Sequence, residues 1–278
     1  MSALAAALRE RALVGPRRVV RSLLLVVGLG LLLVVLFPGL FAPYDAYELD
    51  VPARLQGPSW EHLFGTDEGG RDILSRVLHG ARDSIGSALL VIGIAAAFGT
   101  LWGAVAGWAG GWADRVLMRI VDVFLAFPYL VLAMAVAASI GRDLRSAIIA
   151  LAVVWWPGYA RMIRGQVLAL KGQQHVRAAR TLGAGPSQLL RWHVLPHTLP
   201  QLNARVTVDI GYALVALTGL SFLGLGAQNP SPEWGLMVSN AKTYVLNAWW
   251  YAVLPGAVIL VVVLYLVTLG DELSEEST

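Results

Sequence analysis

The sequence contains no cysteine and few charged residues. The lack of cysteine excludes a disulfide framework, thiolate zinc sites and a cysteine nucleophile. Charged residues make up 14% of the 278 residues, whereas about a quarter is usual in a soluble domain. So few charges cannot cover the water-facing surface of a soluble protein of this size. This indicates that much of the chain lies in a lipid bilayer.

Motifs for nucleotide and metal binding are also missing. The sequence has no G-x-x-x-x-G-K-[ST] loop, so it lacks that device for holding ATP phosphates. His193 and His197 are spaced as in a zinc helix, but Val194 stands where a catalytic Glu is needed and Pro196 interrupts the helix. A membrane-embedded hydrolase would need a nucleophile and a base in register, and we find none. We therefore expect a chain that is not an enzyme and has no metal or cofactor.

Apolar residues dominate instead, at 57% of the chain with a mean hydropathy of +0.65. A membrane-spanning helix needs about 20 mostly apolar residues. Six stretches reach or approach that length: Ser22–Phe41, Ile85–Trp108, Val121–Ile140, Ala147–Ile163, Val206–Leu225 and Ala248–Leu269. The period-two alternation of a membrane β-barrel is absent. The sequence therefore predicts an all-α, polytopic membrane protein with six transmembrane helices in a single domain, 1–278.

Two of the six stretches have special features. The first follows three arginines and is longer than the apolar core of about 7–15 residues in a secretory signal, so we expect a retained span. The fourth is the shortest and contains Pro157-Gly158, so we expect it to bend or to lose a backbone hydrogen bond there.

Lys and Arg predict the orientation, because cytoplasmic connections carry an excess of them. With the N-terminus inside, the inside segments are 1–21, 109–120, 164–205 and the tail 270–278, and the first three of them hold most of the Lys and Arg residues. Both termini are therefore predicted to be cytoplasmic. The segments 42–84 and 226–247 are predicted to be external.

Only two carboxylates fall within the apolar stretches, both near predicted cytoplasmic ends. Arg119 lies three residues before Asp122, and Arg205 lies four before Asp209, so each pair can neutralise itself. A proton- or sodium-driven carrier usually places an ionisable group in mid-span. We therefore expect the energy source to lie outside this chain.

The inside segment 164–205 is long for a connection in a compact bundle. A short helix is predicted at Gln173–Leu182, ended by the glycines at 183 and 185, and Pro186 suits the start of a second helix that ends at Pro196. A third helix, from near Pro200, would run into the fifth span. Val176, Ala179 and Leu182 share one side of the first helix. This helical hairpin suits either docking on a partner or lying on anionic lipid, and the residues do not decide between them.

The external segment 42–84 contains turn and cap signals. Gly65 and Gly69-Gly70 indicate turns, Thr66 or Asp67 is suited to cap a helix, and the sequence reads as helical from Asp72 onward. Together with the turn-rich segment 226–247, this region is predicted to form a cap over a pathway.

Three blocks of sequence resemble a known family. His175–His197, HVRAARTLGAGPSQLLRWHVLPH, resembles the cytoplasmic EAA loop of bacterial ABC importer permeases, although Arg177 stands where Glu is usual and His193 where an aliphatic residue is usual. His62–Arg76, HLFGTDEGGRDILSR, and Leu220–Gly235, LSFLGLGAQNPSPEWG, are similar to the C-type subunit of the dipeptide, oligopeptide and nickel branch. The tail GDELSEEST departs from the family pattern.

The resemblance implies an ABC type I importer permease of the bacterial cytoplasmic (inner) membrane. Such a chain would form half of a pathway for di- or oligopeptides, with a second, homologous permease subunit, two ATPase subunits, an external binding protein and no nucleic acid as a partner. Residues expected to couple to an ATPase are Val176, Arg177, Ala178, Ala179, Arg180, Leu182, Gly183 and Pro196. Residues expected in the external cap are Gly65, Thr66, Asp67, Gly70, Arg71, Asp72, Trp234 and Gly235. The alternative function is a self-sufficient secondary carrier or channel.

Overall fold

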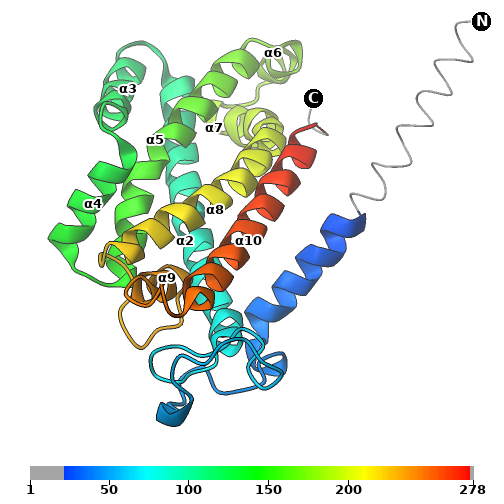
Figure 1. Cartoon of the computed structure of the whole chain (residues 1–278). Coiled ribbons are helices and arrows are strands. Elements are labelled where there is room, and N and C mark those ends of the chain that lie inside the picture. Colours follow the sequence, from blue (N-terminus) through cyan, green and yellow to red (C-terminus); the bar gives the residue numbers. More distant parts are fainter. Residues whose placement is uncertain (1–21, 276–278) are drawn as a thin grey trace, which may run out of the picture.

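The computed structural model describes residues 22–275, so the predicted segment 1–21 and the last three residues lie outside the described part. Helices run between two ends of the molecule (Figure 1). Within residues 22–275 the only β-type pairing is an isolated bridge between Thr66 and Asp72, which agrees with the predicted all-α class.

The helices have the following bounds. The described part of the N-terminal helix is Ser22–Leu36. It is followed by α2 (Ile73–Ala109), α3 (Gly111–Leu125), α4 (Tyr129–Ile140), α5 (Leu144–Lys171), α6 (Gln174–Thr181), α7 (Pro186–Leu189), α8 (Leu199–Phe222), α9 (Trp234–Ala241) and α10 (Trp249–Glu275). Short 3-10 turns lie at Pro38–Leu40 and Val51–Ala53, and a π turn (Leu190–Val194) and a 3-10 turn (Leu195–Thr198) join α7 to α8.

Within residues 22–275, four helical stretches are long and apolar enough to cross a membrane: α2, α5, Pro186–Phe222 and α10. A fifth crossing is available if the bent pair α3 and α4 counts as one. The described part of the N-terminal helix is shorter than these. The count of six spans therefore stays a prediction.

The prediction of one continuous helix at Val121–Ile140 is wrong. α3 ends at Leu125, α4 begins at Tyr129, and the two axes differ in direction by 87°. Pro128 explains the break, because proline has no N–H to donate and disfavours a helical residue before it. We call residues 126–128, where the chain bends between α3 and α4, the elbow.

Proline has the opposite outcome in α5. This helix continues without interruption through the buried Pro157, so the missing N–H removes one hydrogen bond without ending the helix. α5 also extends beyond the predicted Ala147–Ile163, beginning where the Asp143 carboxylate accepts a hydrogen bond from the backbone N–H of Ser146 at 2.8 Å.

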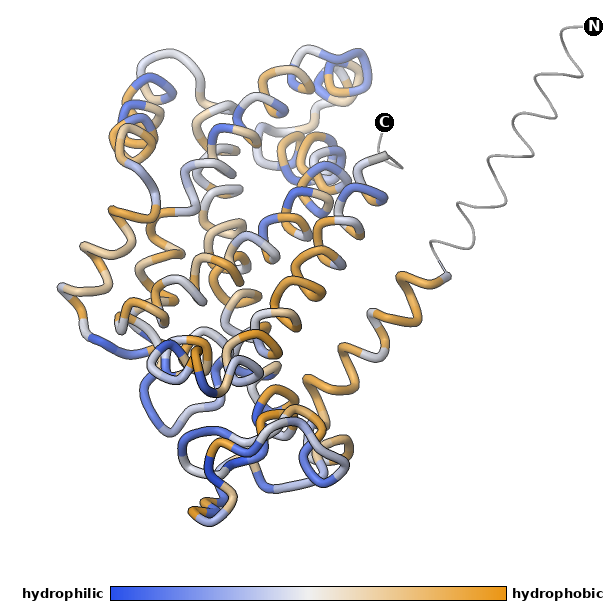
Figure 2. Tube along the Cα trace, viewed as in Figure 1, coloured by the Kyte–Doolittle hydropathy of each residue, from blue (hydrophilic) through white to orange (hydrophobic). Residues whose placement is uncertain are grey.

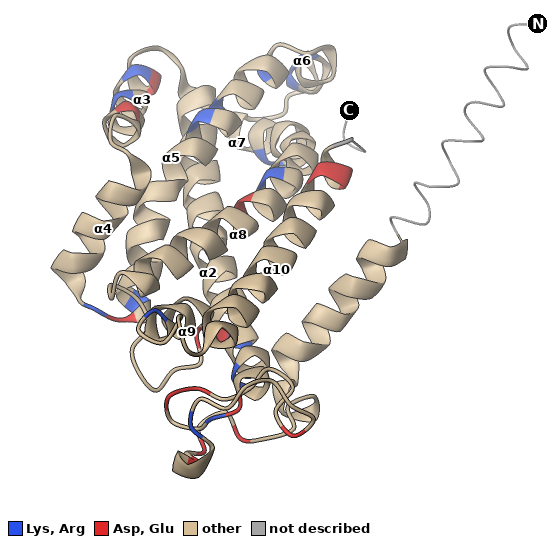
Figure 3. Ribbon diagram, in the orientation of Figure 1, with Lys and Arg blue, Asp and Glu red and all other residues tan. Residues whose placement is uncertain are grey.

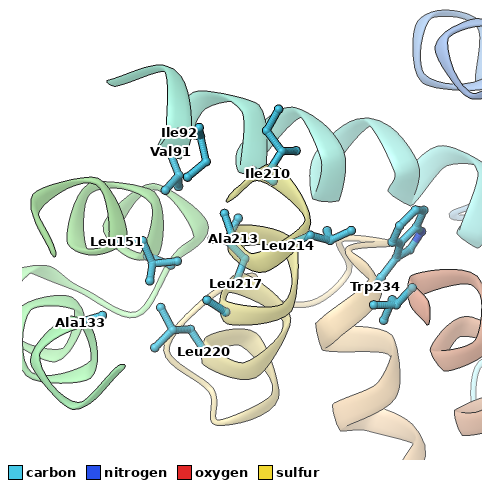
Figure 4. Packing of buried hydrophobic residues seen from close by; sticks show 14 of the residues in the cluster. Val91, Ile92, Ala133, Leu151, Ile210, Ala213, Leu214, Leu217, Leu220 and Trp234 are labelled. Carbon is cyan, nitrogen blue, oxygen red and sulfur yellow. The ribbon is translucent and has the colours of Figure 1, made fainter. Parts of the chain in front are cut away.

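The core is built on close contact between α2 and α5. An added Cβ at Gly99 would lie 2.5 Å from the carbonyl oxygen of Trp156, and one at Gly103 would lie 2.3 Å from that of Ala160. Gly107 continues the same four-residue spacing along α2. Small residues at this spacing let two membrane helices pack backbone to backbone. α8 packs beside them and buries Ile210, Ala213, Leu214 and Leu217 in the same core (Figure 4).

Polar residues gather at the two ends of the helices. Apolar sequence fills the middle (Figure 2), and the charges lie mainly at the hairpin end, near α3, α6 and α7, and in the loops at the opposite end (Figure 3). This banding is what a bilayer requires, because the hydrocarbon region excludes unpaired polar groups. We call residues 172–198 the hairpin, and residues 38–84 together with 223–248 the loop layer.

Candidate functional site: a hairpin and a loop layer at opposite ends

The first helix and the turn of the hairpin have the predicted form, whereas the second α-helix ends at Leu189 instead of Pro196 and continues as a π turn. α6 ends at Thr181, Gly183 adopts a positive φ of +92°, and the Ala184 N–H donates to the Ala179 carbonyl oxygen at 3.1 Å. Pro186 is the first residue of α7, as expected. The chain then passes through the π and 3-10 turns directly into α8, so the hairpin joins the end of α5 to the start of α8.

The structure corrects the predicted docking face of the hairpin. Val176 is fully buried in a small apolar cluster with Ile163 and Val167 of α5, and Ala179 packs against that cluster. Val176 therefore attaches α6 to its own chain and is not open to a partner, and Ala179 is partly buried beside it. The exposed residues of the predicted coupling set are Arg177, Ala178, Arg180, Leu182, Gly183 and Pro196. Leu182 is the most conspicuous of them, since it is apolar and 88% exposed.

A polar contact at the same end joins α5 to α2 directly before the hairpin begins. The Lys171 ammonium donates to the carbonyl oxygen of Trp108, near the end of α2, and lies over the Trp108 ring, 5.2 Å from its centroid. Within the hairpin, the His175 and His197 rings stack at 4.9 Å. The first and last turns of the hairpin are therefore in contact with each other.

Ion pairs join α3 to α5 near the hairpin. Arg164 donates from Nε and Nη2 to the two oxygens of Asp114 at 2.5 and 2.7 Å. Asp122 pairs with Arg161 at 2.7 Å, so the predicted pairing with Arg119 is wrong. The elbow explains this, because it turns α3 so that Asp122 meets a helix far away in the sequence.

At the opposite end, the glycine turns of the loop layer are confirmed. Gly65 and Gly70 have φ values of +71° and +78°. The buried Asp67 carboxylate accepts hydrogen bonds from the N–H of Gly69 at 2.7 Å, from the N–H of Arg71 at 3.0 Å and from Nε of Arg71 at 2.7 Å. The turn is therefore closed around one carboxylate, which is neutralised by the arginine four residues later.

The helix cap in this segment is Asp72, not Thr66 or Asp67 as predicted. The Asp72 carboxylate accepts from the N–H of Ser75 at 2.7 Å at the start of α2. Thr66 instead donates its hydroxyl to the Ala53 carbonyl oxygen and accepts from the N–H of Gln56. The first three turns of α2 thus precede the predicted span and belong structurally to the loop layer.

Sequence reasoning missed Arg76, which joins the two segments of the loop layer. Its guanidinium is 1% exposed and donates to the carbonyl oxygens of Ala46 at 2.9 Å and of Ser231 at 3.2 Å. Nε of Arg76 also lies 3.5 Å from Asp67. A charged residue in the first turns of an apolar helix was the available signal, but its partners are brought together only by the tertiary fold.

Trp234 and Gly235 lie where the second segment of the loop layer meets the helices. Nε1 of Trp234 donates to the Val77 carbonyl oxygen at 2.8 Å, and an added Cβ at Gly235 would lie 2.6 Å from Cα of Thr218. Glu233 caps α9 by accepting from the N–H groups of Gly235 and Leu236. Burial raises the pKa of the Glu233 carboxyl, and these two hydrogen bonds oppose that rise.

Within residues 22–275 no group of three or more His, Asp or Glu side chains is arranged to hold a metal ion. His193 and His197 therefore have no carboxylate partner for a shared metal in this part of the chain. In the described part of the chain, the loop layer is held together by hydrogen bonds and ion pairs, and the hairpin is attached by a small apolar cluster.

The comparison with protein families decides the identity. The family model described as "Binding-protein-dependent transport system inner membrane component" matches residues 99–276, a stretch that holds α5, the hairpin, α8 and α9. The chain belongs to this family. It is thus a permease component of the inner membrane.

Curated relatives of this permease are transport proteins. A probable D,D-dipeptide transport system permease protein, DdpC, of Escherichia coli (strain K12) is 46% identical and covers 87% of this chain and 81% of its own. The dipeptide transport system permease protein DppC of Alkalihalophilus pseudofirmus is 38% identical, and the alignment covers 88% of this chain and 80% of that protein. The glutathione transport system permease protein GsiD of Escherichia coli O157:H7 is 43% identical, and the alignment covers 88% of this chain and 81% of that protein.

A solved structure shares the fold of this permease. A chain of the MetNI methionine ABC transporter, in an inward-facing conformation, aligns with a TM-score of 0.61 and covers 73% of this chain and 96% of its own. The identity is 20%, so the likeness concerns the fold alone. The predicted ABC importer permease fold is confirmed.

Proposed function

We propose that this permease forms half of the translocation pathway of an ATP-driven bacterial importer for di- or oligopeptides. The observation that carries the proposal is the hairpin, an exposed and well-anchored element that joins two spanning helices. A chain that powers its own transport has no need of such a surface. The chain itself carries no ATP-binding loop, so we assign ATP hydrolysis to partner subunits and no catalysis to this one.

The hairpin is proposed to seat in an ATPase subunit through its exposed side. Arg177, Arg180 and Leu182 project from that side, while Val176 holds the hairpin to α5. An exposed leucine flanked by arginines combines an apolar anchor with charges that steer docking. Movement of the ATPases would reach α5 and α8 through this contact.

The remaining partners follow from the same proposal. A second, homologous permease subunit would complete the pathway, and two ATPase subunits would dock on the two hairpins. An external binding protein would deliver the substrate to the loop layer. Both termini and the hairpin would then lie in the cytoplasm, in agreement with the arginines at that end.

The substrate class is inferred from the relatives. Their names give dipeptides, D,D-dipeptides and glutathione, which are all short peptides with a free carboxylate. We therefore propose short peptides as the substrate of this permease.

Reconstitution into proteoliposomes tests the proposal. The permease, its partner permease and candidate ATPases should take up a labelled dipeptide only when ATP and the binding protein are both present. Uptake by this chain alone, without ATP, would support the secondary carrier and overturn the proposal.

A further inference from the structure

A pocket of about 350 Å³ opens at the elbow between α3 and α4. Its walls come from four helices and include Tyr129, Trp155, Arg205, Asp209 and Tyr212. A second pocket, of about 360 Å³, also borders Arg205, Asp209 and Tyr212 and extends towards Asp271 of α10. Arg205 is therefore flanked by open space on two sides.

Arg205 and Asp209 are the two charged residues of α8 (Figure 3). Asp209 lies about 20 Å along the axis from Phe222, the outer end of the helix, at 1.5 Å per residue. This depth falls inside a hydrocarbon layer about 30 Å thick. Charged residues at such a depth face a water-filled space or protein, because exposure to lipid is costly.

The predicted pair of Arg205 and Asp209 is confirmed, and its geometry is asymmetric. Nε of Arg205 donates to Asp209 at 2.8 Å, the aspartate side chain is 2% exposed, and the arginine side chain is 56% exposed. Among residues 22–275 no other acceptor is hydrogen-bonded to Arg205. The aspartate thus fixes the guanidinium through its Nε atom, and both Nη groups remain for a ligand. A guanidinium edge with two parallel N–H donors matches a carboxylate.

Aromatic side chains surround this donor edge. The rings of Tyr129 and Trp155 meet edge to face at 5.5 Å, and Tyr212 is 53% exposed on the turn of α8 after Asp209. Aromatic faces accept both apolar side chains and ammonium groups. The pocket also contains the first residue of α4, where the helix N-terminus adds partial positive charge. The combination suits a small molecule with a carboxylate, an ammonium group and an apolar part.

We propose that Arg205, held by Asp209, binds the C-terminal carboxylate of a peptide on its way through the permease, with Tyr129, Trp155 and Tyr212 as the walls of the site. This inference rests on the proposed function and adds a specificity-determining site within the pathway.

The test compares a dipeptide with its C-terminal amide, which lacks the carboxylate, in proteoliposomes holding the complete transporter and saturating binding protein. Arg205→Gln should lower uptake of the free acid about tenfold or more, as expected for losing hydrogen bonds to a charged group. Uptake of the amide should change little. Arg205→Lys keeps the charge without the two-pronged donor edge, so its loss should be intermediate.

Arg161→Gln is the matched control. Arg161 is similarly exposed, at 57%, and also pairs with an aspartate, Asp122, but it does not border this pocket. The control should leave the ratio of acid to amide uptake unchanged.

Three outcomes count against the site. An unchanged ratio in Arg205→Gln would assign all carboxylate selection to the binding protein. Equal loss in Arg161→Gln would indicate a general effect of charge. Failure of Arg205→Gln to co-purify with the second permease would assign Arg205 to the subunit interface. In each case the wild-type complex still shows ATP-dependent uptake, and only a wild type without such uptake would count against the proposed function.

Discussion

The hairpin and the loop layer are held to the helices by different kinds of interaction. The hairpin is attached by a small apolar cluster around Val176 and leaves its arginines exposed. In the loop layer, Arg76 and Asp67 are buried and bound to several backbone groups. Buried charges tolerate little displacement because each lost partner leaves an uncompensated charge. The loop layer is therefore built to keep one geometry, whereas the hairpin is built to present a surface.

Arg76→Met gives the largest expected effect. It removes one of the two arginines beside Asp67 and leaves the carbonyls of Ala46 and Ser231 without their donor, so we expect a loss of about 3–5 kcal/mol in the free energy of unfolding. Thermal unfolding of the purified permease in detergent measures it. The exposed Arg82, six residues later on α2, is the control, and Arg82→Met should unfold like the wild type. If Arg76→Met and Arg82→Met unfolded at the same temperature, the stabilising role assigned to the buried hydrogen bonds of Arg76 would be wrong.

Two glycines with positive φ, one in the loop layer and one in the hairpin, allow the two ends to be compared directly. An added Cβ at Gly70 would lie 1.7 Å from the carbonyl oxygen of Asp50, whereas one at Gly183 would meet nothing within 4 Å. Gly183→Ala should therefore cost only the backbone term, about 1–2 kcal/mol. Gly70→Ala should cost clearly more, because the clash with the backbone adds to that term. If Gly183→Ala lost more thermal stability than Gly70→Ala, the hairpin turn and not the loop layer would be the more constrained of the two.

The two sides of the hairpin give a third comparison. Val176→Ala removes two buried methyl groups and should cost about 2 kcal/mol. Leu182→Ala should change stability by less than about 0.5 kcal/mol because the side chain is exposed. The same Leu182→Ala variant should reduce co-purification of the ATPase subunits. Retention of the ATPases at wild-type levels would remove Leu182 from the proposed docking side.

The smallest expected effect concerns Glu233. Burial, together with the nearby Asp83, raises the pKa of this carboxyl above its ordinary value of 4.5, so the folded state holds the proton more tightly than the unfolded state does. Wild-type stability should therefore decline as the pH rises from 4.5 through the folded-state pKa. Glu233→Gln should lose that slope in thermal unfolding measured over this range. A slope shared by both proteins would point to another titrating group.

Local signals in the sequence predicted the elements that depend on local chemistry. Gly183 and Pro186 defined the hairpin turn, and the turns at Gly65 and Gly70 followed from glycine alone. Hydropathy located α2, α5, α8 and α10, although it placed the start of α2 too late, because the polar first turns do not resemble a span.

Features that depend on the tertiary fold could not be read in this way. Helical periodicity placed Val176 and Ala179 on one side of α6 but could not tell whether that side faces a partner or the chain itself. The elbow was hidden because Phe127 and Pro128 lie within an unbroken apolar run. Once the elbow was missed, the pairing of Asp122 with Arg161 could not be predicted, since it depends on the direction of α3.

The glycines of α2 have a mechanical consequence. With the backbones of α2 and α5 in contact at Gly99 and Gly103, neither helix can slide along the other without driving a carbonyl into its neighbour. The two helices are therefore expected to move as one rigid unit, with Arg76 and the loop layer at one end and the hairpin at the other. A displacement of the hairpin would therefore be passed along these two helices to the loop layer, and we expect any bending of the bundle to occur at the elbow, residues 126–128, where the chain changes direction by 87°.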